Sequence, residues 1–248
     1  MNLGKLKCSK IEYNYLHNIN TKELFERGKL LTFHKVETEE DLEQVYRLRY
    51  HIYCLEKGFE PKEKYPDGIE MDEYDFYSIH FIAKVLDEAV GTARLILNNP
   101  LGFPAERYCK ADISAFRIKK EQTVEISRFA VSNTLVRAFH FDRTKILIGL
   151  FREVYQETKQ LGIENLCAAM GKGLQRLLCK YGIIFSPLGP VVDYHGARAL
   201  HVSSMANVEE DIFLKDCDLF KFISSPNLDK NNVGNAAYSR QGVKVCQF

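Results

Sequence analysis

The chain has 248 residues, 46% of them hydrophobic, which suits one elaborated domain with a sizeable core. Its 34 basic and 33 acidic residues nearly cancel, so no overall field attracts nucleic acid or an anionic membrane. No stretch approaches the roughly 18 uninterrupted apolar residues that a spanning helix needs, and residues 1–20 lack the apolar centre of a signal peptide. We therefore expect a cytoplasmic protein with no transmembrane segment and no nucleic-acid partner.

The seven cysteines are scattered singly, with no CxxC pair and no histidine nearby at metal-ligand spacing. A dispersed set of this kind fits a reducing compartment and argues against a structural zinc site. We expect no metal and no tightly bound cofactor.

The first predicted helix covers residues 38–58. Thr38 is placed to cap its start, Asp41 is near enough to reach back, and Gly58 is placed to end it. Apolar residues recur at three- and four-residue steps along one face, and Arg49 falls on that stripe. Because an inward-facing charge is costly unless it is paired, Arg49 should meet a carboxylate or a polar cavity. Alternatively, it lies at the edge of the stripe and extends to water.

An acidic loop follows this helix, and its sequence "EMDEYD" places three carboxylates within six positions, at Glu70, Asp72 and Asp75. The loop is either a solvated turn or the binding site of a positively charged group. That group would be an arginine of the protein or the ammonium of a substrate.

Strands are predicted over residues 78–86 and 90–97, joined as a hairpin by a short polar turn, and over residues 124–131. Helices and strands then alternate, with a helix capped by Asp142, a strand, a second helix and a last strand, at residues 144–162, 163–170, 172–182 and 183–190. This alternation implies parallel pairing in the second half, whereas the hairpin is antiparallel. We therefore expect the α/β (α+β) class, with a mixed central sheet flanked by helices. The predicted core covers about 31–200, with polar extensions over 1–30 and 203–248.

Charges interrupt the apolar strands. Regular alternation would place Glu125 and Ser127 on one face of the third strand and Arg128 on the other. Arg94, inside the second hairpin strand, poses the same difficulty, because a buried charge needs a partner. Arginines and carboxylates of this number could satisfy one another, either as a structural ion-pair network or as a functional site.

Four segments, "RLRYHIYCLEKGF", "EMDEYD", "VGTARL" and "EISRFAV", resemble in order and separation the acyl-homoserine-lactone synthase family and the related N-acyl amino acid synthases. That family has an arginine-bearing first helix, an E-x-D-x-x-D loop, a G-x-x-R-L strand and an E-x-S-R strand. Residues 147–196 look like a narrower group, the PEP-CTERM/exosortase-associated acyltransferases. The resemblance covers residues 40 to about 200 and implies a GNAT-like acyltransferase fold.

The resemblance also implies roles for single residues. Glu125 matches the carboxylate that assists deprotonation of the attacking amine, and Ser127 and Arg128 in the same motif are further catalytic candidates. Charged residues of the family network, expected to bind substrate, are matched by Arg49, Asp72, Asp75 and Arg94.

Two departures from the family pattern bear on the substrates. Tyr53 and Phe59 stand where the lactone synthases usually have phenylalanine and tryptophan beside the adenosylmethionine site, which favours another acceptor. The usual GNAT phosphate loop before the long helix is replaced by "VRAFHFDR", which favours an acyl-carrier-protein thioester over acetyl-CoA. Three basic residues lie near the start of that helix: Arg137, Arg143 and Lys145. They are expected to contact the carrier protein or the phosphate of its pantetheine. Alternatively, they form a solvated basic surface.

The leading hypothesis is an N-acyltransferase that moves a fatty acyl group from acyl-carrier protein, or acyl-CoA, to the amine of an amino acid or similar small acceptor. An amine has a pKa on the order of 8 to 10, so a carboxylate or water chain must take its proton before it attacks. A thiol leaves readily, and backbone N–H groups at a bulge in "EISRFAV" could hold the oxyanion. His195 is expected to make a structural hydrogen bond rather than to transfer a proton.

Two alternatives remain. One is a homoserine-lactone synthase that uses S-adenosylmethionine as acceptor. The other is a non-catalytic acyl-carrier or lipid-binding protein in which the charged residues are purely structural.

Overall fold

The computed structural model describes residues 31–225, so the extension predicted over 1–30 and the tail 226–248 lie outside the described residues. The strands are β1 (Leu31–Lys35), β2 (Ser78–Val85), β3 (Glu88–Ile96), β4 (Thr123–Val131), β5 (Asn165–Met170), β6 (Ser186–Pro187), β7 (Val192–Asp193) and β8 (Ala197–Ser204). The α-helices are α3 (Glu39–Tyr50), α4 (Pro104–Cys109), α5 (Asn133–Ala138), α6 (Arg143–Gln160), α7 (Lys172–Lys180), α8 (Met205–Lys215) and α9 (Cys217–Ser224). A π-helix, η1 (His51–Glu56), continues α3, and 3₁₀ turns occur at Lys62–Lys64, Asp75–Tyr77, Ile113–Phe116 and Lys120–Gln122.

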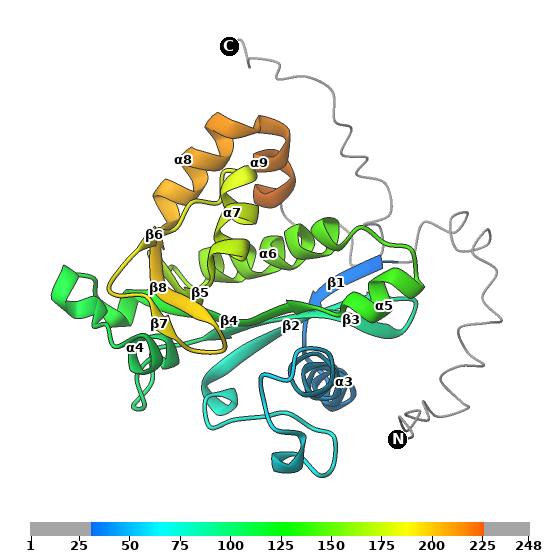
Figure 1. The fold of residues 1–248 in the computed structure, drawn as a ribbon. Coiled ribbons are helices and arrows are strands. Elements are labelled where there is room, and N and C mark those ends of the chain that lie inside the picture. Colours follow the sequence, from blue (N-terminus) through cyan, green and yellow to red (C-terminus); the bar gives the residue numbers. More distant parts are fainter. Residues whose placement is uncertain (1–30, 226–248) are drawn as a thin grey trace.

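One open mixed sheet, with the strand order β1-β2-β3-β4-β5-β8-β6, forms the centre of the molecule. Helix α3 covers one face and α6 covers the other (Figure 1). Strands β1 to β4 pair antiparallel in sequence, which confirms the predicted hairpin. The expected mixed sheet flanked by helices is confirmed.

The second half of the sheet is less parallel than predicted. Among the described strands, only β4 and β5 pair in parallel, because β8 returns from the β7–β8 turn and inserts antiparallel beside β5. The strand predicted over 183–190 is reduced to β6, since Pro187 and Pro190 have no backbone N–H for a ladder and Gly189 has a φ of 100°.

The C-terminal boundary predicted at residue 203 also differs from the structure. Strand β8 continues to Ser204, and α8 and α9 follow it. Met205, Ile212 and Ile223 from this segment are buried in the main hydrophobic cluster with α6. Residues 203–225 therefore belong to the folded core.

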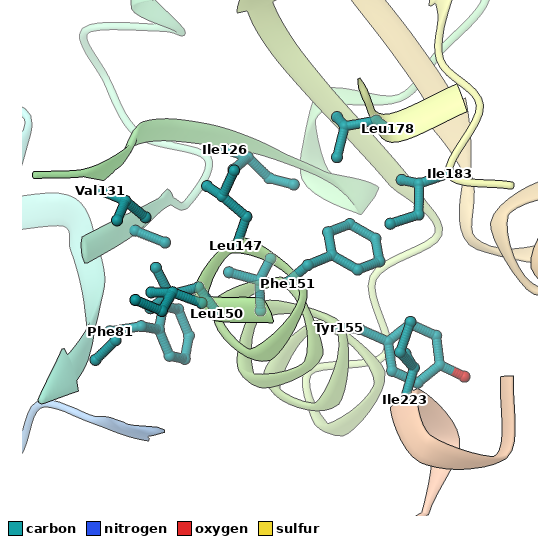
Figure 2. Packing of buried hydrophobic residues seen from close by; sticks show 14 of the residues in the cluster. Phe81, Ile126, Val131, Leu147, Leu150, Phe151, Tyr155, Leu178, Ile183 and Ile223 are labelled. Atoms are coloured by element: carbon teal, nitrogen blue, oxygen red, sulfur yellow. The ribbon is translucent and has the colours of Figure 1, made fainter. Parts of the chain in front are cut away.

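The main hydrophobic core fills the space between the sheet and α6. In Figure 2, Leu147 of α6 points toward Ile126, Leu150 lies beside Phe81, and Phe151 points toward Leu178 and Ile183. A smaller hydrophobic cluster between α3 and the sheet covers the opposite face of the sheet. The predicted N-caps of α3 and α6 are confirmed, because Thr38 accepts from Asp41 N–H and Asp142 accepts from Thr144 N–H. The Asp41 carboxylate does not reach back to the cap but contacts His34 and Lys84. Within residues 31–225, no helix is long and apolar enough to cross a bilayer.

Two irregularities shape the middle of the sheet. Strand β4 pairs with β5 only from Thr123 to Glu125, and after that the two strands no longer pair. In the ladder with β3, Arg94 lies opposite Ser127 but Thr92 lies opposite Ala130, so β4 contains one extra residue. This β-bulge lies beside the point where β4 and β5 separate.

Candidate active site

Three arginines and three carboxylates form a closed ring in which each charge contacts two opposite charges. We call it the ion-pair ring; in order, its members are Arg49, Glu70, Arg128, Asp72, Arg94 and Asp75. The arginines come from α3, β3 and β4, and all three carboxylates come from the "EMDEYD" loop. Because the charges cancel, the ring lies in the interior without an isolated buried charge. The acidic loop therefore binds arginines of the protein.

Arg49 is the most enclosed member, with 0% of its surface exposed. Its Nη1 donates to Asp75 Oδ1 at 2.7 Å and its Nε donates to Glu70. Burial alone would raise the pKa of Glu70, but Arg49 and Arg128 outweigh it and lower that pKa to about 2. The prediction that Arg49 points inward against a carboxylate is confirmed.

Arg94 links the ion-pair ring to β4. Its Nη1 donates to Asp72 Oδ1 and to Asp75 Oδ1, at 2.6 Å in each case, and its Nε donates to Ser127 Oγ at 2.8 Å. Burial opposes ionisation of Asp75, yet Arg49 and Arg94 hold the pKa of Asp75 well below its usual range. The hydroxyl of Ser127 is thus held in place by a buried guanidinium.

The bulge in β4 decides where Arg128 points. Arg128 has a φ of 46°, a left-handed conformation that is strained for a residue with a Cβ. Its Nη2 donates to Glu70 at 2.7 Å and to Asp72 at 3.1 Å, so it lies on the same side of the sheet as Glu125 and Ser127. The face predicted for Arg128 by regular alternation is therefore wrong, because the extra residue shifts the strand period.

Glu125 is separate from the ion-pair ring although it lies on the same strand. Its side chain is buried, with 2% of the residue exposed, and Oε2 accepts from the backbone N–H of Ala105 at 2.8 Å. No basic side chain among the described residues lies within 4 Å of it. Burial therefore dominates and raises the pKa of Glu125 to about 8.

A cavity of about 300 Å³, the larger cavity, opens beside Glu125. Its lining includes Ser127, Arg128 and Arg94 from the sheet, Tyr108 from α4 and Tyr194 from the β7–β8 turn. Helix α4 lies beside β7 at this end of the sheet (Figure 1). Glu125 thus has access to a polar space large enough for a small substrate.

A second space of about 80 Å³, the smaller cavity, lies where β4 and β5 separate. Its lining is mainly apolar, with Phe129, Phe151, Ala168, Leu174 and Phe185 among the contributors. Both cavities share Ser127 and Arg128 as wall residues. The polar space and the apolar space therefore meet at the β4 bulge.

The two predicted aromatic residues occupy different positions. Tyr53 is carried by the π-helix η1, a local widening that often marks functional sites, and lines both cavities with its ring 5.2 Å from the Arg128 guanidinium carbon. Phe59 lies behind the wall of the larger cavity and stacks on His195 at 5.2 Å. His195 Nε2 lies 3.3 Å from Glu60, in agreement with the expected structural role.

The predicted basic residues are not part of either cavity wall. Arg137 on α5 and Lys145 on α6 are exposed, and Arg143 begins α6. Burial lowers the pKa of Lys57, and Arg143 contributes to that shift, so these two cations lie in the same electrostatic neighbourhood.

Sequence reasoning missed two residues of the larger cavity, Tyr194 and Arg198. The acidic loop predicted a role for Glu70 as well, but the family resemblance assigned it none, although it completes the ion-pair ring. The acidic spacing of the loop is a local signal for Glu70. No local pattern identifies the other two, because they reach the cavity through the late strand β8 and its turn.

Comparisons with known proteins give one family match and several similar folds. The family model described as "N-acyl amino acid synthase FeeM" matches residues 44–203. A comparison with curated proteins finds no match.

Solved structures with a similar fold include the CoA-dependent acyl-homoserine lactone synthase BjaI with SAM and isopentyl-CoA. It has 22% identity and a TM-score of 0.60, over 76% of this chain and 89% of that one. FeeM, an N-acyl amino acid synthase from uncultured soil microbes, has 15% identity and a TM-score of 0.57, over 75% of this chain and 97% of that one. The AHL synthase LasI has 17% identity and a TM-score of 0.54, over 74% and 94% of the two chains.

Proposed function

The chain belongs to the N-acyl amino acid synthase FeeM family and is an N-acyltransferase, and from this premise we propose that Glu125 is its general base and that a fatty acyl thioester is its donor. The amine of an amino acid or similar small acceptor binds in the larger cavity. Its nitrogen attacks the thioester carbonyl, the C–S bond breaks, and the thiol leaves. Glu125 takes the proton that the ammonium must lose.

The environment of Glu125 carries this proposal. The other carboxylates that line the larger cavity already contact basic groups: Glu60 contacts His195, Asp72 belongs to the ion-pair ring, and Glu73 contacts Arg107 at 3.7 Å. Glu125 has a backbone N–H as its partner instead. A base with a pKa near 8 is matched to an amine that must be deprotonated near neutral pH.

The β4 bulge supports a place for the thioester. A bulge leaves its extra residue outside the strand ladder, so a backbone N–H near Arg128 is available for the developing oxyanion. The smaller cavity beside it is apolar and suits the beginning of an acyl chain. Ser127 Oγ, which accepts from Arg94, keeps its own proton for the carbonyl or the leaving sulfur.

The ion-pair ring supports this arrangement indirectly. Arg49, Asp72, Asp75 and Arg94 act in the proposal by fixing Arg128 and Ser127 at the meeting point of the two cavities. Tyr53 lines the acceptor side, and Phe59 supports that wall from behind. The acceptor therefore meets a rigid surface, and rigid placement of reactants is a large part of the rate enhancement in group transfer.

The donor and the cellular context are further parts of the proposal. Arg137, Arg143 and Lys145 lie near the start of α6, where an acidic carrier protein or pantetheine phosphate would be attracted, so acyl-carrier protein is the proposed donor carrier and acyl-CoA the substitute. The resemblance of residues 147–196 supports the narrower assignment to the PEP-CTERM/exosortase-associated acyltransferases, acting in the cytoplasm.

The test is thiol release from purified protein given acyl-carrier protein or acyl-CoA thioesters and a mixture of amino acids, with mass spectrometry of the products. Glu125→Gln should fold, since it is nearly isosteric, and should lose almost all turnover. Glu121→Gln, an exposed position in the same segment, is the matched control and should keep full turnover. Full turnover by Glu125→Gln would exclude Glu125 as the base.

A second acceptor, S-adenosylmethionine, is considered because a structure of similar fold contains SAM. Release of methylthioadenosine would identify it. The third possibility, a non-catalytic acyl-carrier or lipid-binding protein, is not supported, because the family is one of enzymes.

A further inference from the structure

The charges around the larger cavity can be paired off almost completely. Two of the cations that line it, Arg94 and Arg128, belong to the ion-pair ring, and Lys64 lies 4.0 Å from Glu60. Arg198 lines the same cavity, yet no carboxylate among residues 31–225 lies within 4 Å of its guanidinium, and its side chain makes no hydrogen bond to those residues. One guanidinium therefore faces this space without an acidic partner.

The position of Arg198 is nevertheless well defined. It lies near the start of β8, and its guanidinium carbon is 5.5 Å from the centre of the Phe59 ring and 5.8 Å from that of Tyr194. Contacts of a guanidinium with aromatic faces hold its orientation while leaving its N–H groups free to donate. Such an arginine is suited to binding an anion that comes from outside the protein.

The aromatic residues around Arg198 are themselves held in place. Tyr194 stacks on Tyr108 of α4 at 4.4 Å, nearly parallel, and lies 4.6 Å from the ring of His195. His195 has a φ of 52°, a strained conformation that the surrounding contacts with Phe59 and Glu60 must maintain. The β7–β8 turn thus holds the aromatic rings in fixed positions around the Arg198 guanidinium.

We propose that Arg198 binds the carboxylate of the acceptor amino acid, and that it is the residue through which the enzyme selects a free acid over its amide. This inference rests on the proposed function. The larger cavity presents a proton acceptor, Glu125, and an unpaired cation, Arg198, and a zwitterionic amino acid carries the two complementary groups. A guanidinium donates two parallel hydrogen bonds to a carboxylate, which also selects its orientation.

A phosphate of the donor is the competing ligand for this arginine, and the same experiment distinguishes it. The observations favour the acceptor, because Arg198 shares the larger cavity with Glu125, whereas the basic residues near the start of α6 lie outside both cavities. Arg198 also lines the smaller cavity, so it stands where the two substrates would meet.

The test supplies a lauroyl or palmitoyl thioester of carrier protein or CoA together with either the standard L-amino acids or their carboxamides. Products identified by mass spectrometry name the preferred amino acid. The wild type should acylate the free acid at least about tenfold more efficiently than its amide, the size expected for one charge-assisted hydrogen bond. Arg198→Met keeps an unbranched stem but removes the charge, and it should raise the KM for the acid by about tenfold or more.

The variant should leave the KM of the thioester and the KM of the amide unchanged, and Arg198→Lys should recover part of the affinity for the acid. Arg107→Met is the matched control, because Arg107 also lies over an aromatic ring, that of Tyr108, but does not line either cavity. It should change none of these constants.

Three results would overturn the inference. Equal use of acids and amides by the wild type would remove the need for a carboxylate partner. An Arg198→Met variant that raises only the thioester KM would assign the residue to the donor. A wild type that acylates neither mixture, with intact thioester recovered, would overturn the proposed function together with this inference.

Discussion

Arg94 and Glu125 lie on paired strands and line the same cavity, yet they do not form an ion pair. The Arg94 guanidinium contacts Asp72 and Asp75 at 2.6 Å, whereas Glu125 accepts only a backbone N–H within the described part of the chain. The guanidinium of Arg94 is thus bound to the carboxylates of the ion-pair ring and does not pair with the Glu125 carboxylate. This separation leaves Glu125 available for proton transfer, and two predictions depend on it.

The first prediction concerns the pH profile of the reaction. Because burial raises the pKa of Glu125 to about 8, the base is mostly protonated at neutral pH and becomes ionised as pH rises. The value of kcat/KM should therefore increase about tenfold per pH unit below pH 8 and level off above it, measured by thiol release at saturating thioester. A profile that is flat from pH 6 to 9 would contradict the assigned base.

The second prediction concerns stability, which should fall as pH rises, whereas activity should increase. The folded pKa of Glu125 lies above that of an unfolded glutamate, about 4.5, so its stabilising effect is complete below pH 4.5 and is lost as pH rises through about 8. Glu125→Gln cannot ionise. Its melting temperature should therefore exceed that of the wild type at pH 9 by more than it does at pH 5. An identical difference at both pH values would show that Glu125 titrates normally in the folded protein.

The third prediction tests the ion-pair ring. Glu70→Gln leaves Arg49 buried with one partner fewer, and breaking a buried pair in this way costs about 3–5 kcal/mol of unfolding free energy. Glu73→Gln, three residues later in the same loop, changes an exposed carboxylate and should stay within about 0.5 kcal/mol of the wild type. Urea unfolding at pH 7 measures both. Equal stabilities of the two variants would mean that the ring contributes little.

The fourth prediction concerns the acyl chain. Ala168 on β5 lines the smaller cavity and is buried, so Ala168→Leu places a larger branched side chain in the apolar space. The preferred thioester should become shorter, and the KM for long-chain thioesters should rise, because the added side chain occupies the same volume. The KM for the amine acceptor is the internal control and should not change. An unchanged chain-length preference would place the acyl chain elsewhere.

Much of the site could be predicted from the sequence because its signals are local. A charged side chain is costly to bury alone. Arg49 lies on an apolar helical stripe and Glu125 in an apolar strand, so the sequence predicts a partner or a function for each without knowledge of the fold. The caps at Thr38 and Asp142 depend on neighbours three or fewer residues away, and for that reason their predictions were confirmed.

The tertiary structure decided what depends on contacts between distant segments. The face on which Arg128 lies follows from one extra residue in β4 relative to β3, and a register between strands is not encoded in either strand alone. Directly contacting pairs of the ion-pair ring are up to 58 positions apart in the chain, and Arg198 reaches the cavity only because β8 inserts beside β5. The sequence by itself determined which charges needed partners. Packing determined which partners they found, and it left Arg198 of the larger cavity without a carboxylate among the residues described.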